Sequence, residues 1–181
     1  GMGFIEETGA AQYLRDARIL TIYEGTTAIQ ANDLVGRKTT RDGGAMARAL
    51  AAEIESTEDL LRACGDADAQ AFAARLSAAR GAFLDVVDYV VIRGRTEPNT
   101  VYAGSVPYLM LAGNLAAGWQ LGRALLVALR KRVAGDDAEF MNRKIAVARF
   151  YAEHLLTRVP GLRDSIVDGA GAVSALKAEA F

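Results

Sequence analysis

The feature that most restricts the possible folds is an apolar spacing of three and four residues that persists from residue 46 to residue 155. Residues three and four apart share one face of an α-helix, so the spacing predicts amphipathic helices. No stretch shows the period of two that a half-buried strand needs. The stripes are Met46, Leu50, Ile54, Thr57, Leu61 and Cys64; Phe72, Leu76, Ala79, Phe83, Val86 and Val90; Tyr108, Leu111, Leu115, Trp119, Gly122, Leu126, Leu129 and Val133; and Met141, Ile145, Ala148, Ala152 and Leu155. We therefore expect an all-α fold, an antiparallel helix bundle with long helices packed at shallow angles.

Glycine, aspartate and proline mark the ends of these stripes. Residues 65–66 end the first stripe, and residues 135–137 end the third helix and cap the fourth. Gly94 ends the second stripe, and we expect residues 96–100 to form a loop. Pro160 should end the fourth helix, with one short helix after it.

The first 44 residues predict two further helices and a linker. One helix should cover residues 8–22 and a second residues 28–37, because apolar residues again recur at helical spacing. Thr27 and Gln30 have the spacing of a capping box, so Thr27 is the predicted N-cap of the second helix. Residues 39–44 are polar and end in two glycines, which indicates a linker. We therefore divide the chain into a domain of residues 1–40 and a helical-bundle domain of residues 41–181.

Composition excludes several classes of function. The net charge of −1 gives no overall field that favours nucleic acid or an anionic membrane. Cys64 and His154 are the only residues of their types, which argues against a disulfide, a metal centre or a histidine-based catalytic triad. Residues 98–122 carry no charge, but their glycines and amides favour a buried bundle helix over a membrane span. One thiol and no signal peptide at the start suit a cytoplasmic protein.

Glu24 is the candidate catalytic residue. It stands at the break between the two N-terminal helices, immediately before Gly25, Thr26 and Thr27. A helix start carries unpaired N–H groups and a partial positive charge that favour an anion nearby. The same pattern also describes a solvated loop residue, so these four residues alone leave both interpretations open.

A longer string around Glu24 resembles the C-terminal signature of the acyl-CoA dehydrogenases. The string is Arg15-Asp16-Ala17-Arg18-Ile19, then Ile22-Tyr23-Glu24-Gly25-Thr26, then Ile29-Gln30. The resemblance covers residues 1–38. Gly1-Met2-Gly3-Phe4 looks like the end of a glycine-rich loop that touches the flavin in that family, so the chain looks as if it begins in mid-domain. Gly1-Met2 is equally well interpreted as an expression remnant.

The second part of the chain resembles the extra C-terminal domain of a longer acyl-CoA dehydrogenase branch, which includes enzymes that handle 3-methylmercaptopropionyl-CoA. The motifs are Ser105-Val106-Pro107-Tyr108-Leu109, Ala117-Gly118-Trp119 and the stretch from Ala148 to Leu156. We interpret Trp119 and Tyr151 as core residues and His154 as a packing histidine rather than a catalyst.

The resemblance implies FAD-dependent α,β-dehydrogenation of an acyl-CoA thioester, with Glu24 as the base for the α-proton. It implies that Gly1, Gly25, Thr26 and Thr27 approach the FAD, and that an electron-transfer flavoprotein accepts the electrons. Ala28 departs from the polar residue of many relatives, which leaves a side-chain contact there in doubt. No metal is implied.

Two alternatives stay open at this point: a non-catalytic helical interaction or oligomerisation module, and an acyl-CoA oxidase. We expect the chain alone to be inactive, because the family builds its flavin cleft with two further domains. We also expect residues 5–38 to dock on the bundle or to pair with a second copy, since their apolar faces need a partner.

Overall fold

The computed structural model describes residues 2–23, 25–173 and 175. Every regular element among the described residues is a helix, and none of them is a strand. Two 3-10 turns, η1 (Met2–Phe4) and η2 (Glu6–Thr8), precede the helices. The helices are α1 (Ala10–Ile19), α2 (Thr27–Asp33), α3 (Ala45–Ala63), α4 (Ala67–Arg93), α5 (Pro98–Ala103), α6 (Ser105–Val133), α7 (Ala138–His154), α8 (Val159–Val167) and α9 (Ala170–Val173). The all-α antiparallel bundle is thereby confirmed.

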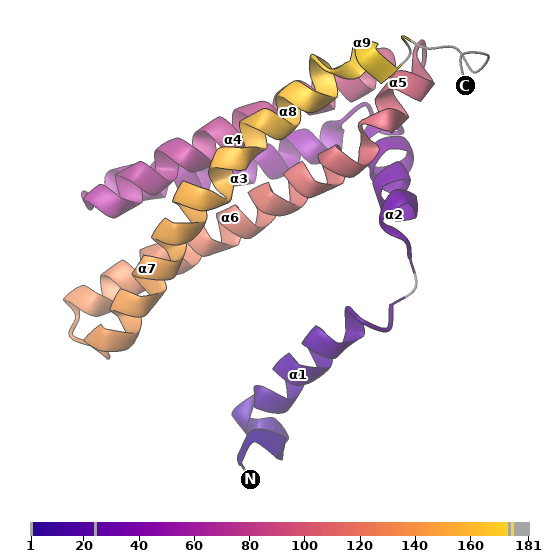
Figure 1. Ribbon diagram of the computed structural model, residues 1–181. Helices are drawn as coiled ribbons and strands as arrows, with labels where there is room; N and C mark the ends of the chain where they lie inside the picture. Colours follow the sequence, from indigo (N-terminus) through magenta and orange to yellow (C-terminus); the bar gives the residue numbers. More distant parts are fainter. Residues whose placement is uncertain (1, 24, 174, 176–181) are drawn as a thin grey trace.

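The two longest helices, α4 and α6, form the centre of the bundle (Figure 1). Each packs against α3, α7 and α8. The connections from α3 to α4 and from α6 to α7 are three and four residues long, which makes consecutive helices antiparallel neighbours.

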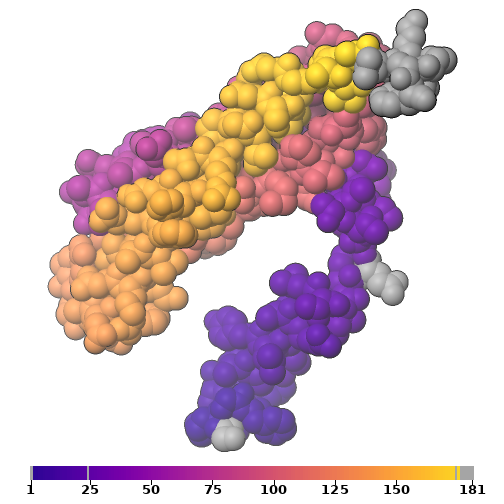
Figure 2. Space-filling model, viewed as in Figure 1, coloured from indigo at the N-terminus to yellow at the C-terminus, as the bar shows by residue number. Residues whose placement is uncertain are grey.

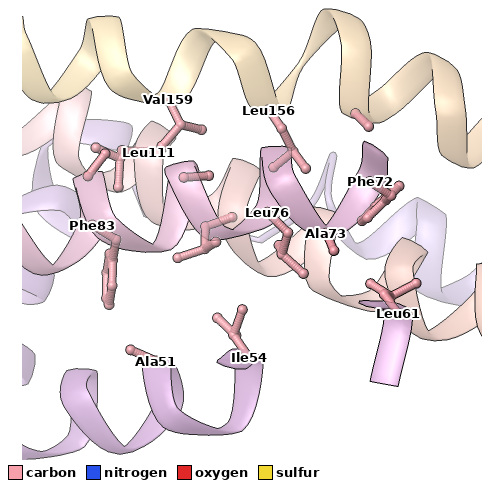
Figure 3. Packing of buried hydrophobic residues seen from close by; sticks show 14 of the residues in the cluster. Ala51, Ile54, Leu61, Phe72, Ala73, Leu76, Phe83, Leu111, Leu156 and Val159 are labelled. Atoms are coloured by element: carbon pink, nitrogen blue, oxygen red, sulfur yellow. The ribbon is translucent and has the colours of Figure 1, made fainter. Parts of the chain in front are cut away.

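The buried core joins residues from all of these helices (Figure 3). Every residue of the predicted α4 stripe is buried, from Phe72 to Val90. Ile54 of α3, Leu111 of α6 and Leu156 between α7 and α8 close on that stripe, and none of the three is more than 1% exposed. Each such aliphatic side chain contributes about 1.5–3 kcal/mol by leaving water.

Two glycines let α6 approach its neighbours closely. A Cβ at Gly118 would lie 2.6 Å from Leu156 Cδ2, and one at Gly122 would lie 3.1 Å from Phe72 Cε1. Leu156 and Phe72 therefore occupy the space that a side chain at Gly118 or Gly122 would need. This explains why the predicted α6 stripe contains a glycine among large apolar residues.

The predicted linker, residues 39–44, is wrong at its first two residues and correct at residues 41–44, which form a turn. The helix that starts with α2 continues as a π-helix, η3 (Leu34–Thr40), so helical structure covers residues 27–40. Thr39 is buried, and its hydroxyl lies 3.0 Å from the hydroxyl of Tyr108 on α6. The chain turns at residues 41–44, with positive φ at Gly43 and Gly44, before α3 begins. A buried tertiary hydrogen bond thus joins η3 to the bundle at the position where the sequence predicts the start of a linker.

Aspartate side chains cap the N-termini of α4 and α7. Asp66 Oδ1 accepts hydrogen bonds from the backbone N–H groups of Asp68 and Ala69 at the start of α4. Asp137 accepts from the N–H of Phe140 at the start of α7. Both caps satisfy donors that a helix leaves unpaired, and both confirm the predicted turns.

Other predictions fail at helix ends and surfaces. Met46, Leu50, Cys64 and Val133 belong to predicted stripes but are exposed, because these positions lie toward the ends of α3 and α6. The predicted loop 96–100 is partly helical, since α5 starts at Pro98. The fourth helix ends at His154, and Pro160 sits in the first turn of α8, where proline fits well.

The N-terminal segment stands away from the bundle (Figure 2). All ten residues of α1 are described, and none of them is buried. Its apolar side chains Tyr13 and Leu14, and Leu20 immediately after it, are 72–82% exposed. Of the segment that we expected to dock, α2 and η3 meet the bundle through buried Ala31 and Val35, whereas α1 makes no such contact.

In the part of the chain that the structure describes, every helix is too short or too polar to cross a lipid bilayer.

Gly44 provides a test of this packing. Its φ is +82°, and a Cβ there would lie 2.8 Å from Val87 Cγ1, so Gly44→Ala combines backbone strain with overpacking. We expect it to lower the free energy of unfolding by about 2–4 kcal/mol in urea titrations. Gly43→Ala has positive φ but open space and should cost about 1–2 kcal/mol. Gly81→Ala, in a helix and facing open space, should gain up to about 1 kcal/mol. Equal costs at Gly43 and Gly44 would contradict the proposed contact with Val87.

Tyr108 provides a test by pH. Burial raises the pKa of Tyr108 above its ordinary value of 10.0, so the folded state holds this proton more tightly than the unfolded chain does. The stability that follows is fully present below about pH 10 and is lost as the pH rises further. Thermal unfolding between about pH 9 and pH 11 should show a steeper loss of stability for the wild type than for Tyr108→Phe. Parallel curves would mean that Tyr108 ionises freely in the folded protein.

Candidate functional site

The predicted site lies at the junction between α1 and α2. Glu24, the predicted base, and Gly1, a predicted flavin contact, lie outside the described residues. The described part of the junction consists of Tyr23 on one side and Gly25, Thr26 and Thr27 on the other.

The junction starts with a tight end to α1. The N–H of Tyr23 donates to the carbonyl of Ile19 at 2.8 Å, which extends the hydrogen-bonded turns by four residues. The hydroxyl of Thr21 donates to the carbonyl of Arg18 at 2.9 Å and accepts from the Arg18 guanidinium at 2.8 Å. These bonds fix the backbone up to Tyr23 although the segment is exposed.

Tyr23 bridges the junction. Its hydroxyl accepts a hydrogen bond of 2.9 Å from Nε2 of Gln30, seven residues later and on α2. Gly25 fits beneath this bridge: a Cβ there would lie 2.5 Å from Gln30 Nε2 and 3.0 Å from Tyr23 Cε1. The bridge therefore joins the end of the α1 segment to α2 across the junction.

The capping of α2 differs from the prediction by one residue. Thr26, not Thr27, is the N-cap: its backbone is extended and its Oγ1 accepts from the N–H of Ile29 at 3.3 Å. Thr27 is the first residue of the helix. Gln30 cannot complete a capping box at Thr27 because its side chain is bonded to Tyr23. Thr26 therefore caps α2, while Gln30 bonds to Tyr23 and takes no part in the cap.

The whole junction is open to solvent. Gly25, Thr26, Thr27 and Ala28 are exposed, and Tyr23 is 64% exposed. They form at most one wall of a binding site. The described residues provide no wall opposite Gly25, Thr26 and Thr27. Taken alone, these exposed residues therefore do not enclose a flavin ring.

Two hollows of the described surface lie elsewhere. One of about 640 Å³ lies between the ends of α3 and α6, lined mainly by Leu60, Leu126, Leu129 and Val133 with Arg130 at its edge. Another of about 870 Å³ lies between the N-terminal turns and α1, lined by Phe4, Ile5, Ala11 and Leu14 among others. Neither contains a predicted site residue.

The described titratable groups give no second catalytic centre. Glu58 is fully buried, but Arg80 Nε donates to it at 2.8 Å and Arg62 reaches it at 3.2 Å, which makes it a structural ion cluster. The hydrogen bond to Glu58 raises the pKa of Arg80 above its ordinary value. Among the described residues, no three His, Cys, Asp or Glu side chains converge as metal ligands would.

Of the three residues predicted to pack in the core, two join helices and the third is exposed. Trp119 is half-buried and donates to Thr57 Oγ1 at 2.8 Å, and Tyr151 donates to the carbonyl of Asn114 at 3.1 Å, so both join the helices as expected. His154 is exposed rather than packed in the core, and its ring lies against Phe150.

Comparison with known proteins covers both parts of the chain. Residues 1–38 match the family model "Acyl-CoA dehydrogenase, C-terminal domain", and residues 50–177 match "Acetyl-CoA dehydrogenase C-terminal like". The junction falls in the first match and most of the bundle in the second.

Curated relatives agree with these matches. The chain is 54% identical over 168 residues to 3-methylmercaptopropionyl-CoA dehydrogenase of Ruegeria pomeroyi, covering 93% of this chain and 28% of that protein. It is 35% identical over 181 residues to the broad-specificity linear acyl-CoA dehydrogenase FadE5 of Mycobacterium tuberculosis, covering 92% of this chain and 28% of that protein. A butyryl-CoA dehydrogenase of Syntrophomonas wolfei is 34% identical over 167 residues, covering 90% of this chain and 26% of that protein.

The chain thus spans little more than a quarter of the length of the curated relatives it matches. The second family model alone covers well over half of the chain's 181 residues. The chain belongs to the acyl-CoA dehydrogenase family.

Proposed function

We propose that this chain is the C-terminal part of a flavin-dependent acyl-CoA dehydrogenase and carries its catalytic base, Glu24. The observation that carries the proposal is the junction itself. Tyr23 and Gly25, the chain neighbours of residue 24, lie at the break between α1 and α2, where Tyr23 bonds to Gln30 and Thr26 caps α2. A base must be held at a fixed position to reach a carbon-bound proton, and we propose that the junction provides that constraint for Glu24.

Removal of the α-proton requires a stronger base than a free carboxylate and stabilisation of the enolate that forms. The proton on the carbon next to a thioester carbonyl is far less acidic than an ordinary carboxylic acid. Exclusion of water by a bound acyl chain raises the pKa of a carboxylate, which makes it a stronger base. Hydrogen bonds to the thioester oxygen stabilise the enolate that develops, and we propose the backbone N–H of Glu24 as one of these donors.

The flavin belongs to the same proposal. Gly25, Thr26 and Thr27 are the described residues that would lie along it, with Gly1 at the other end of the segment. FAD, when bound, accepts the hydrogen that leaves the β-carbon as hydride. The role of this chain is to present the carboxylate and to cover one side of the ring. Ala28 supplies no polar group to that side.

The exposed N-terminal arm, residues 2–23 and 25–29, suits an arrangement in which further protein surrounds it. Its exposed apolar side chains include Phe4, Tyr13, Leu14, Leu20, Ile22 and Ile29. Monomeric proteins rarely leave so much contiguous apolar surface uncovered. We propose that the remaining domains of the enzyme cover this arm, and that the whole enzyme is an oligomer that passes electrons to an electron-transfer flavoprotein in the cytoplasm.

The same exposed arm also favours a second candidate, a non-catalytic helical module that uses the motif only for packing. The two candidates differ in what Glu24 does, and one substitution separates them.

Glu24→Gln in the complete polypeptide tests the proposed base. The amide keeps the size of the side chain but cannot accept the α-proton, so we expect turnover of an acyl-CoA substrate to fall by about 10²–10⁴-fold with flavin retained. The matched control is Glu53→Gln, an exposed glutamate of α3 in the bundle, which should leave turnover unchanged. Unchanged turnover in Glu24→Gln, with flavin still bound, would support the packing module instead.

The 181-residue chain alone tests the claim that it supplies one wall of the site. Since Gly25, Thr26 and Thr27 are exposed and no described residue faces them, purified chain mixed with FAD should lose the cofactor during gel filtration. It should also show no acyl-CoA dehydrogenase activity with an artificial electron acceptor. Flavin absorbance that stays with the protein at one FAD per chain would show that these residues form a complete site.

A further inference from the structure

Gln30 makes the hydrogen bond that crosses the junction between α1 and α2. Its Nε2 donates to the hydroxyl of Tyr23 at 2.9 Å. Figure 1 shows α1 directed away from the bundle, so packing on the bundle does not fix the α1 side of the junction. Of the hydrogen bonds between described residues, the one from Gln30 alone joins residues 2–23 to residues 25–173. Apart from the covalent chain, the relative position of the two sides therefore depends on this bond.

The α2 side of the bond is anchored to the bundle. α2 packs against α6, and Ala31, next to Gln30, is buried. At the end of the same helical segment, the hydroxyls of Thr39 and Tyr108 lie 3.0 Å apart. Gln30 itself is half-buried, so its side chain extends from a backbone that the bundle holds in place. The bond to Tyr23 thus relates the α1 side of the junction to a fixed part of the fold.

Gln30 occupies a helix position at which an apolar residue is common. With Thr26 as the N-cap, Gly25 is the N′ residue and Gln30 is N4. Apolar residues at N′ and N4 often pack on one another as a hydrophobic staple. Here the N′ residue has no side chain, and a Cβ on Gly25 would lie 2.5 Å from Gln30 Nε2 and 3.0 Å from Tyr23 Cε1. Gly25 therefore leaves the space through which the amide reaches Tyr23, and a hydrogen bond takes the place of the staple.

Helix capping does not account for this bond. The cap of α2 comes from Oγ1 of Thr26, which accepts from the N–H of Ile29 at 3.3 Å. On the other side, the N–H of Tyr23 already donates to the carbonyl of Ile19, so the end of the α1 segment does not need the Tyr23 hydroxyl. The bond from Gln30 is additional to both helix ends, and it determines the geometry between them.

We propose that Gln30 is a positioning residue for the catalytic base: through Tyr23 it sets the geometry of the break at which Glu24 stands. The inference rests on the proposed function, in which Glu24 removes the α-proton. Gln30 itself touches neither substrate nor flavin. A misplacement of about 1 Å can lower a rate by about 10²-fold, whereas one exposed hydrogen bond contributes little to the stability of a fold. Loss of this bond should therefore affect turnover and leave the bundle intact.

A double-mutant cycle in the complete enzyme tests the proposal. Gln30→Met keeps the length of the side chain without the amide, and Tyr23→Phe keeps the ring without the hydroxyl. Each should lower kcat for an acyl-CoA substrate by about 5–30-fold, with flavin content and KM changed by less than about two-fold. The double variant should be no slower than the slower single variant, because both changes remove the same bond. The matched control is Gln70→Met, the same change at an exposed glutamine of α4, which should leave kcat unchanged.

An isotope effect separates positioning from general damage to the fold. Deuterium at the α-carbon of the substrate slows the step in which the base removes the proton. The isotope effect on kcat should increase in Gln30→Met and in Tyr23→Phe, because this step becomes slower relative to the other steps. A loss of folded enzyme would lower the amount of active protein without changing the isotope effect.

Cleavage by chymotrypsin gives a measurement that needs neither flavin nor substrate. This protease cleaves after Tyr and Phe, so the wild type and both variants of the 181-residue chain have a cleavage site after residue 23. Without the bond to α2, mass spectrometry should show cleavage there about 3–10-fold faster than in the wild type or in Gln70→Met. Cleavage at the wild-type rate in both variants would show that the bond does not restrain the junction and would overturn the proposal.

The results distinguish failure of this inference from failure of the proposed function. Unchanged kcat in Gln30→Met, with Glu24→Gln inactive, would overturn the positioning role and leave Glu24 as the base. Losses that multiply in the double variant, or an unchanged isotope effect, would show that Gln30 and Tyr23 act independently of the proton step and would overturn it too. Unchanged turnover in Glu24→Gln would overturn the proposed function and, with it, this inference.

Discussion

The close approach of α4 and α6 is the contact on which the other elements depend. Gly122 brings α6 to within van der Waals distance of Phe72, and Gly118 leaves room for Leu156. Around this pair the helices α3, α7 and α8 bury their apolar faces. η3 is joined to the same pair through the Thr39–Tyr108 hydrogen bond, so the position of α2, and with it one side of the candidate site, follows from the packing of the bundle.

Much of this architecture could be predicted from the sequence because the α4 stripe repeats without interruption at helical spacing. Predictions failed where tertiary contacts decide the outcome. Thr39 lies in a polar, glycine-ended stretch that is typical of a linker, yet its partner is Tyr108, 69 residues away.

The candidate site was predictable in place but not in detail. The motif around Glu24 identified the junction, and the structure supplies what the motif lacked, namely the bridge from Tyr23 to Gln30 and the cap at Thr26. Gln30 has the correct spacing for a capping box at Thr27, but its amide reaches Tyr23 instead. Spacing alone does not determine which of two polar neighbours a flexible side chain will bind.

The account as a whole depends on one acid–base step, the removal of a proton from the carbon next to a thioester carbonyl by Glu24. Exchange of that proton with solvent deuterium measures this step without requiring electron transfer. The complete enzyme in heavy water, with an acyl-CoA that it binds but cannot oxidise, should introduce deuterium at the α-carbon, and Glu24→Gln should abolish the exchange. Exchange that proceeds at the same rate in both proteins would contradict the account.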